Sequence, residues 1–155
     1  KFLFIFFAII AVGVSVKEYT KNLKTDYILE DTYPVEASEW LNYYIEENNI
    51  SKEDFHLYNE YNYGSYLLFK GIPVFIDSRA EPYSPEFNKD VTVFDDYMEL
   101  TSGKISYIEL FEKYDINYAI VYQDSMTNTY MKEDEKCLEL YSDDYFVIYH
   151  ILDWF

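Results

Sequence analysis

Residues 59–79, NEYNYGSYLLFKGIPVFIDSR, decide how we interpret the fold of this chain. The stretch holds two of the four glycines and ends on the only arginine of the sequence. Its apolar runs predict a helical turn at 64–69, closed by Gly71, and then a strand at 73–77. A strand that ends in Asp-Ser-Arg brings polar groups to the edge of a sheet, where open α/β folds form their binding sites.

On both sides of this stretch, apolar spacing and turn residues predict alternating helices and strands. The first helix is expected to follow a cap at Asp31 or Thr32, to place Pro34 in its first turn, and to end at 48–49. Further elements are expected as helices at 91–101 and 106–114, and as strands at 55–58, 118–122, 138–141 and 145–151, the last two forming a hairpin. The prediction is α/β: a small three-layer sheet of mostly parallel strands with a C-terminal antiparallel hairpin, preceded by a hydrophobic N-terminal helix.

The N-terminal residues 2–16, FLFIFFAIIAVGVSV, are an unbroken run of apolar and small residues beside Lys1 and Lys17. Two interpretations compete, the core of a signal peptide and the end of a transmembrane helix. Residues 14–16, VSV, match a cleavage site only in part, which favours the transmembrane helix. We therefore expect a transmembrane helix end or anchor over 1–16, a connector over 17–32 and a soluble α/β domain over 33–155.

Composition excludes several classes of function. The net charge of −17 argues against a nucleic-acid partner, because phosphate binding needs clustered basic residues. With one cysteine and two histidines, neither a disulfide framework nor a zinc centre is expected, and we predict no metal and no other cofactor. The sequence has no Gly-x-Ser-x-Gly motif and no glycine-rich phosphate loop, so no catalytic residue is predicted.

The candidate site is therefore a binding site within 59–83. Asp77 and Arg79 alternate with Ser78, so their side chains leave the same side of an extended chain. The two could pair with each other or with Glu60 and Glu81 as a structural lock, or Arg79 could grip a carboxylate or a phosphate. Flat tyrosine faces could stack on a sugar or a peptide. The predicted ligand-binding residues are Asn59, Glu60, Tyr61, Tyr63, Tyr66, Asp77, Arg79 and Tyr83.

Several motifs together resemble one family. They are YPVEA at 33–37, LYNEYNYGSYL at 57–67 and PVFIDSR at 73–79, with Tyr83 and the later YxIxY at 114–118 and FVIY at 146–149. The chain resembles the soluble C-terminal domain of bacterial polytopic membrane glycosyltransferases that use polyprenyl-linked sugars. Ser65 and Ser78 stand where that family has glycines. Tyr63-Gly64 is also distantly similar to the peptide-recognition segment of oligosaccharyltransferases.

The resemblance implies a function without catalysis in this chain, since the catalytic carboxylate of the family lies in the membrane portion. The expected role is that of an extracytoplasmic accessory domain at the cell membrane. The expected partners are the membrane, through the N-terminal helix, the transmembrane portion of the same protein, and a glycan or peptide acceptor. The alternative is a membrane-anchored extracellular module that binds a ligand or another protein.

Overall fold

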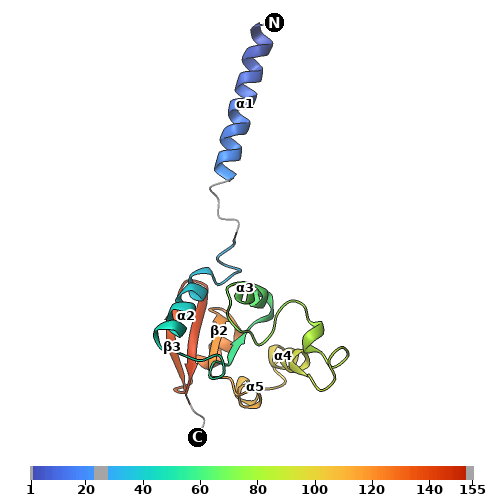
Figure 1. The fold of residues 1–155 in the computed structure, drawn as a ribbon, viewed down its shortest axis with the longest axis vertical. Helices are drawn as coiled ribbons and strands as arrows, with labels where there is room; N and C mark the ends of the chain where they lie inside the picture. The colour runs from blue at the N-terminus through green and yellow to red at the C-terminus, as the bar shows by residue number, and fades with distance from the viewer. Residues whose placement is uncertain (1, 23–27, 153–155) are drawn as a thin grey trace.

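A computed structural model of the protein describes residues 2–22 and 28–152. Part of the predicted connector, 23–27, and the end of the predicted domain, 153–155, lie outside these residues. Helix α1 (Phe2–Asn22) precedes the folded domain, as Figure 1 shows. Nowhere in 2–22 and 28–152 does a helix reach the length and apolarity that crossing a bilayer demands. The hydrophobic N-terminal helix predicted at 1–16 as a transmembrane helix end or anchor is therefore not supported by the described residues.

The domain is built on a mixed sheet of four strands in the order β1-β2-β4-β3. The strands are β1 (Leu57–Asn59), β2 (Tyr118–Tyr122), β3 (Cys137–Ser142) and β4 (Phe146–Ile151). Only β1 and β2 run parallel, whereas β4 is antiparallel to both β2 and β3. The predicted hairpin is confirmed, but the prediction of mostly parallel strands is wrong, because the hairpin supplies half of the sheet and residues 73–77 do not join it.

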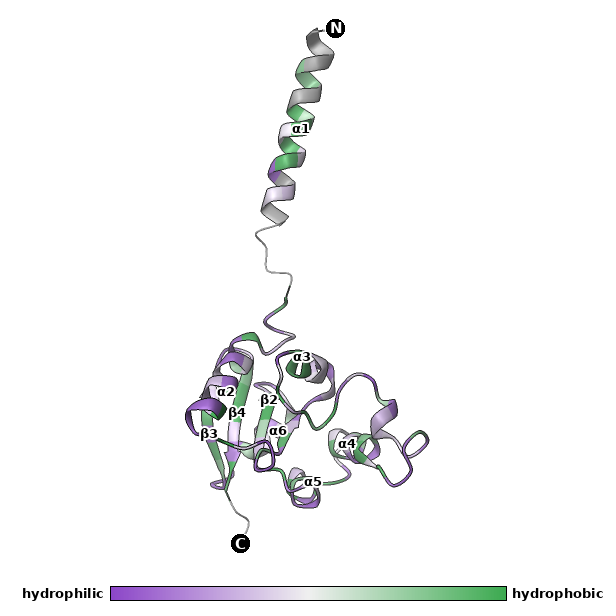
Figure 2. Cartoon of the chain, in the orientation of Figure 1, coloured by the Kyte–Doolittle hydropathy of each residue, from purple (hydrophilic) through white to green (hydrophobic). Residues whose placement is uncertain are grey.

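Helices cover both faces of the sheet, so the predicted three layers are confirmed. Side chains alternate along β2: Tyr118 and Ile120 pack with α2 (Val35–Glu47) and α3 (Gly64–Phe69), whereas Ala119 and Val121 pack on the opposite face. That opposite face is covered by α5 (Tyr107–Tyr114) and α6 (Met126–Met131), with α4 (Val93–Thr101) beside α5. Figure 2 shows the hydrophobic residues of β2 and β4 between these layers.

Several local predictions are confirmed. Helix α3 has the predicted bounds and is followed by Gly71 at φ 81°, and α4 is followed by Gly103 at φ 71°. Both glycines take the left-handed conformation in which they end helices. Helix α2 also forms, but the predicted cap is wrong, because Pro34 is its N-cap and Thr32 instead donates its hydroxyl proton to the Asp31 carboxylate.

The predicted strand at 73–77 is wrong. These residues are irregular, although Ile76 and Asp77 are buried. The reason is that their hydrogen bonds go to a side chain, that of Asn59, in place of a neighbouring strand. The short helices η1 (Tyr61–Tyr63) and η2 (Glu81–Tyr83) flank this region before and after it.

Candidate ligand-binding site

Asn59 organises the irregular segment. Its side chain is fully buried at the end of β1, where Oδ1 accepts a hydrogen bond from the Phe75 backbone N–H at 2.8 Å. Nδ2 donates to the carbonyl oxygens of Ile76 at 2.8 Å and Glu60 at 3.0 Å. One amide thus satisfies donors and acceptors that a paired strand would otherwise satisfy. Asn59 therefore holds the backbone of 75–76 in place, and its buried side chain is not accessible to a ligand.

Gly64 allows the same segment to approach α3. A Cβ at this position would lie 2.0 Å from the carbonyl oxygen of Ile76 and 2.9 Å from the Cα of Asp77. The φ of Gly64 is −57°, so close approach and not backbone conformation requires glycine here. The contact fixes Asp77 against the first turn of α3.

Asp77 holds Arg79 in place. The Asp77 side chain is fully buried, and its Oδ1 accepts hydrogen bonds from the backbone N–H and from Nε of Arg79, both at 2.9 Å. Its Oδ2 accepts from Nη2 of Arg79 and, at 2.8 Å, from the hydroxyl of Tyr83. The Arg79 guanidinium, the Arg79 backbone amide and the Tyr83 hydroxyl together lower the pKa of Asp77 to about 2. Asp77 and Arg79 therefore do pair, as one of the two interpretations expected.

The pairing leaves one side of the guanidinium open. The Arg79 side chain is 61% exposed, although Nε and Nη2 both donate to Asp77. A guanidinium carries five N–H donors in a rigid fork, so further donors remain on its outer edge. Arg79 is thus both a partner of Asp77 and a fixed, permanently charged group at the surface.

Hydroxyl groups lie next to Arg79 in sequence and in space. Ser78 precedes it, and the hydroxyl oxygens of Ser65 and Ser78 are 2.8 Å apart at the exposed surface. The Tyr61 hydroxyl donates to the Ser78 carbonyl oxygen at 2.8 Å. We call Tyr61, Ser65, Ser78, Arg79 and Tyr83 the arginine surface. It offers hydroxyls and one cation, which are groups that bind an acidic, hydroxylated ligand.

The two remaining tyrosines of the predicted site contribute to packing. Tyr63 is fully buried, and its hydroxyl donates to the Ile120 carbonyl oxygen at 2.6 Å. The Tyr66 ring centroid lies 5.4 Å from that of Tyr33, and Lys70 Nζ lies 5.6 Å above the Tyr66 ring. Both residues fix α3 to its surroundings and are not part of the arginine surface.

Glu60 lies apart from the arginine surface, at the edge of the sheet where β1 and β2 end. It follows β1, and its carboxyl group interacts with the Ser125 side chain and the Tyr122 backbone at the end of β2. Burial raises the pKa of Glu60 to about 7, the charge of Asp124 adds to the rise, and hydrogen bonds with Ser125 and Tyr122 oppose it. A carboxyl group with this pKa can exchange a proton near neutral pH. The sequence did not lead us to predict that Glu60 lies beside Tyr122 and Ser125, although the parallel strands β1 and β2 end at the same edge of the sheet.

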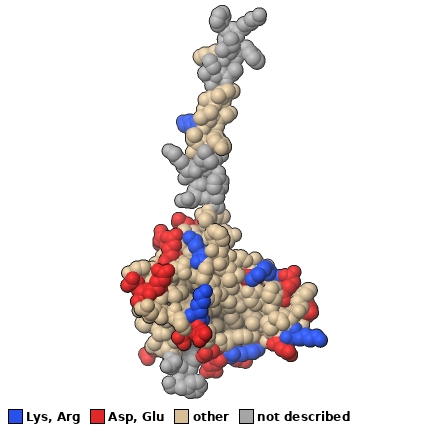
Figure 3. All heavy atoms as spheres, viewed as in Figure 1, with Lys and Arg blue, Asp and Glu red and all other residues tan. Residues whose placement is uncertain are grey.

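Metal chemistry finds no support in the part of the chain that the structure describes, where no three His, Cys, Asp or Glu side chains are placed to hold an ion. On the face that Figure 3 shows, the acidic side chains lie at several separate places. The single cysteine, Cys137, is buried, and burial raises the pKa of its thiol to about 11. Comparisons with protein-family models, curated proteins and solved structures give no match for this chain.

Proposed function

We propose that the chain is an extracytoplasmic accessory domain of a membrane glycosyltransferase that uses a lipid-linked sugar, and that its arginine surface binds an acidic group of the acceptor. One observation carries the binding role: a fully buried Asp77 orients Arg79, whose side chain remains 61% exposed. Because the Arg79 guanidinium is already oriented in the free protein, its side chain loses less conformational entropy when a ligand binds, which favours binding.

Two further features support the proposal. The motifs at 57–67 and 73–79, on which the family resemblance rests, lie against each other through Gly64 and Asn59. Asp77 is also already saturated by Arg79 and Tyr83, so it is poorly suited to act as a base or a nucleophile. Recognition therefore fits this surface better than catalysis does.

The test uses the full chain and two probes, glucuronate and glucose, which differ by one carboxylate. Nuclear magnetic resonance titration should show glucuronate shifting the amide signals of 78–83, and glucose leaving them in place. Arg79→Lys keeps a cation beside Asp77 but loses the planar fork, so it should weaken glucuronate binding. Lys89→Gln, which removes an exposed cation elsewhere, is the control. Unchanged glucuronate binding in Arg79→Lys would contradict the proposal.

The glycosyltransferase role is tested in cells that carry the transferase containing this domain. Arg79→Lys should reduce sugar transfer, with the protein present at its normal level. If glucuronate binding falls and transfer does not, the chain is the alternative, a membrane-anchored module that binds a ligand for another purpose.

A further inference from the structure

A cleft separate from the arginine surface lies on the face of the sheet that carries α5 and α6. It has a volume of about 780 Å³ and lies between α6 and the turn that joins α4 to α5. Small-molecule sites have volumes of roughly 300–1,000 Å³. None of the residues of the arginine surface lines it. We call this hollow the α6 cleft.

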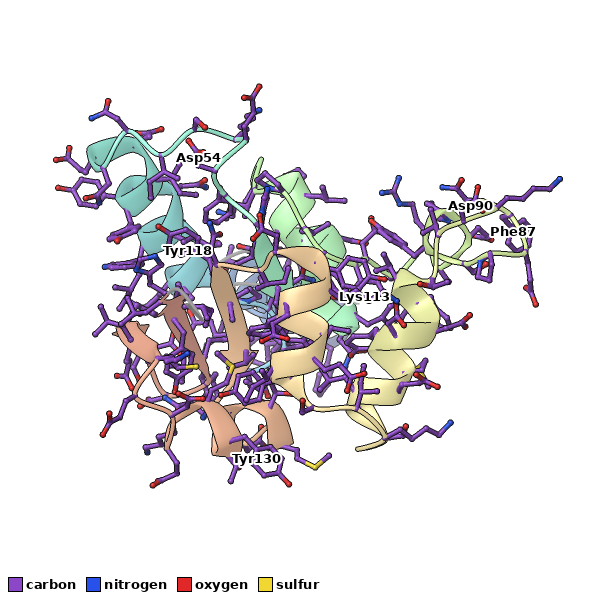
Figure 4. All side chains as sticks on the ribbon, turned by 90° about the horizontal axis from the view of Figure 1, so that it is seen from below. Asp54, Phe87, Asp90, Lys113, Tyr118 and Tyr130 are labelled. Carbon is purple, nitrogen blue, oxygen red and sulfur yellow. The ribbon has the colours of Figure 1, made fainter. Side chains whose placement is uncertain are left out.

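The walls of the α6 cleft are mainly apolar. Leu100, Ile105 and Ile108 line it from the α4–α5 side, and Met126 and Tyr130 line it from α6. Met126 is 49% exposed and Tyr130 is 61% exposed, so this apolar surface meets water. Figure 4 shows Tyr130 at the outer edge of the domain. A methionine and a tyrosine at the mouth suit a ligand, since methionine adapts its shape and tyrosine offers a flat face.

The charged groups of the α6 cleft favour a cation. Asp134 lines the cleft and is fixed in place, because it accepts hydrogen bonds from the Tyr107 hydroxyl and from the Lys136 backbone N–H. The Tyr107 hydrogen bond, followed by that of the Lys136 amide, lowers the pKa of Asp134, so it is ionised at neutral pH. Glu133 and Glu135 flank Asp134, so the lining has three acidic residues and two basic ones, Lys104 and Lys136. The whole chain carries a net charge of −17. Both the lining and the long-range field therefore attract positive charge.

We propose that the α6 cleft is a binding site for an organic cation, a small apolar molecule that carries a protonated amine. The apolar body lies between Ile105 and Ile108 on one wall and Met126 on the other. The ammonium group lies beside Asp134 and Glu133, where the Tyr130 ring can also face it. The site is independent of the arginine surface, which selects the opposite charge.

The test compares two probes that share an indole ring, tryptamine as the cation and indole-3-propionate as the anion. With the isotope-labelled full chain, tryptamine should shift the amide signals of 104–108 and 126–136, and indole-3-propionate should bind there at least about tenfold more weakly. Equal affinity for the two probes, or no binding of tryptamine, overturns the proposal.

Matched variants locate the site. Met126→Trp fills the α6 cleft from its mouth and should reduce tryptamine affinity by about tenfold or more. Met98→Trp is the control, because Met98 is equally exposed at 49% but does not line the cleft. Glu133→Gln combined with Glu135→Gln should reduce the preference for tryptamine over indole-3-propionate. Equal tryptamine binding in the two tryptophan variants, or an unchanged preference in the glutamine variant, contradicts the proposed site.

Discussion

Gly64 and Ile76 are in such close contact that a Cβ on the glycine would lie 2.0 Å from the isoleucine carbonyl oxygen. The obstacle is backbone, which cannot rotate away as a side chain can. The start of α3 and the segment that carries Asp77 are therefore fixed to each other at this point.

Gly64→Ala should accordingly destabilise the domain by about 3 kcal/mol or more, since either α3 or the 76–77 backbone must shift. The midpoint of urea unfolding, followed by circular dichroism, measures the loss. Gly13→Ala in α1 is the control, because nothing lies within 4 Å of a Cβ there. A Gly64→Ala protein with the wild-type midpoint would show that the contact is not tight.

Asn59→Asp tests the buried amide. Aspartate keeps an acceptor for the Phe75 N–H but loses the donor to the Ile76 carbonyl oxygen, and it buries a carboxylate against that oxygen. We expect a loss of about 2–4 kcal/mol in the free energy of unfolding at neutral pH, partly recovered in acid as the carboxylate is protonated. Asn62→Asp, at an exposed position nearby, should change little. A similar effect of the two substitutions would argue against the bridging role of Asn59.

Asp77 predicts acid sensitivity. Its pKa is lowered from 3.8 to about 2 in the folded protein, so its stabilisation is present above pH 4 and is lost as the pH falls through about 2. Asp77→Asn should be less stable than wild type at pH 6 by about 2 kcal/mol, and the difference should shrink toward pH 2. Thermal unfolding across this range measures it, with Asp95→Asn at an exposed position of α4 as the control. A pH-independent difference would contradict the ionised Asp77–Arg79 pair.

The contribution of Glu60 to stability is expected to depend on pH in the opposite direction. Its folded pKa is about 7 against 4.5 for an ordinary glutamate, so the folded state retains a proton that the unfolded state releases between these values. The contribution of Glu60 to stability is full below pH 4.5 and is lost as the pH rises through about 7. Glu60→Gln should remove this loss, which amounts to no more than about 3 kcal/mol. Carbon-13 titration of the Glu60 carboxyl group gives its pKa directly, and a value near 4.5 would refute the prediction.

The sequence predicted the elements whose signals are local. Helix α3 and its terminal Gly71, strand β2 and the β3–β4 hairpin follow from apolar runs bounded by turn residues. Helix α6 was missed because its sequence, MTNTYM, has no apolar periodicity; its N-cap is Ser125, whose hydroxyl oxygen accepts from the Asn128 N–H.

Errors at the site arose from contacts between distant residues. The apolar run at 73–77 has the composition of a strand, but its backbone hydrogen bonds with the distant side chain of Asn59 replace those of a neighbouring strand. The pairing of Asp77 with Arg79 was among the expected arrangements, because the two residues are close in sequence. The neighbours of Glu60 at the end of β2 depend on which strand β1 joins, and local patterns do not contain that information.

The position of β1 has a consequence for the order of assembly. Strands β3 and β4 are joined by a short turn, whereas β1 is only three residues long and pairs Leu57 with Tyr118 across a long intervening chain. Closing that loop costs more entropy, so β1 is expected to dock late in folding. The arginine surface is attached through this strand. An acidic ligand bound there would therefore slow amide hydrogen exchange in β1 before it affects the β3–β4 hairpin.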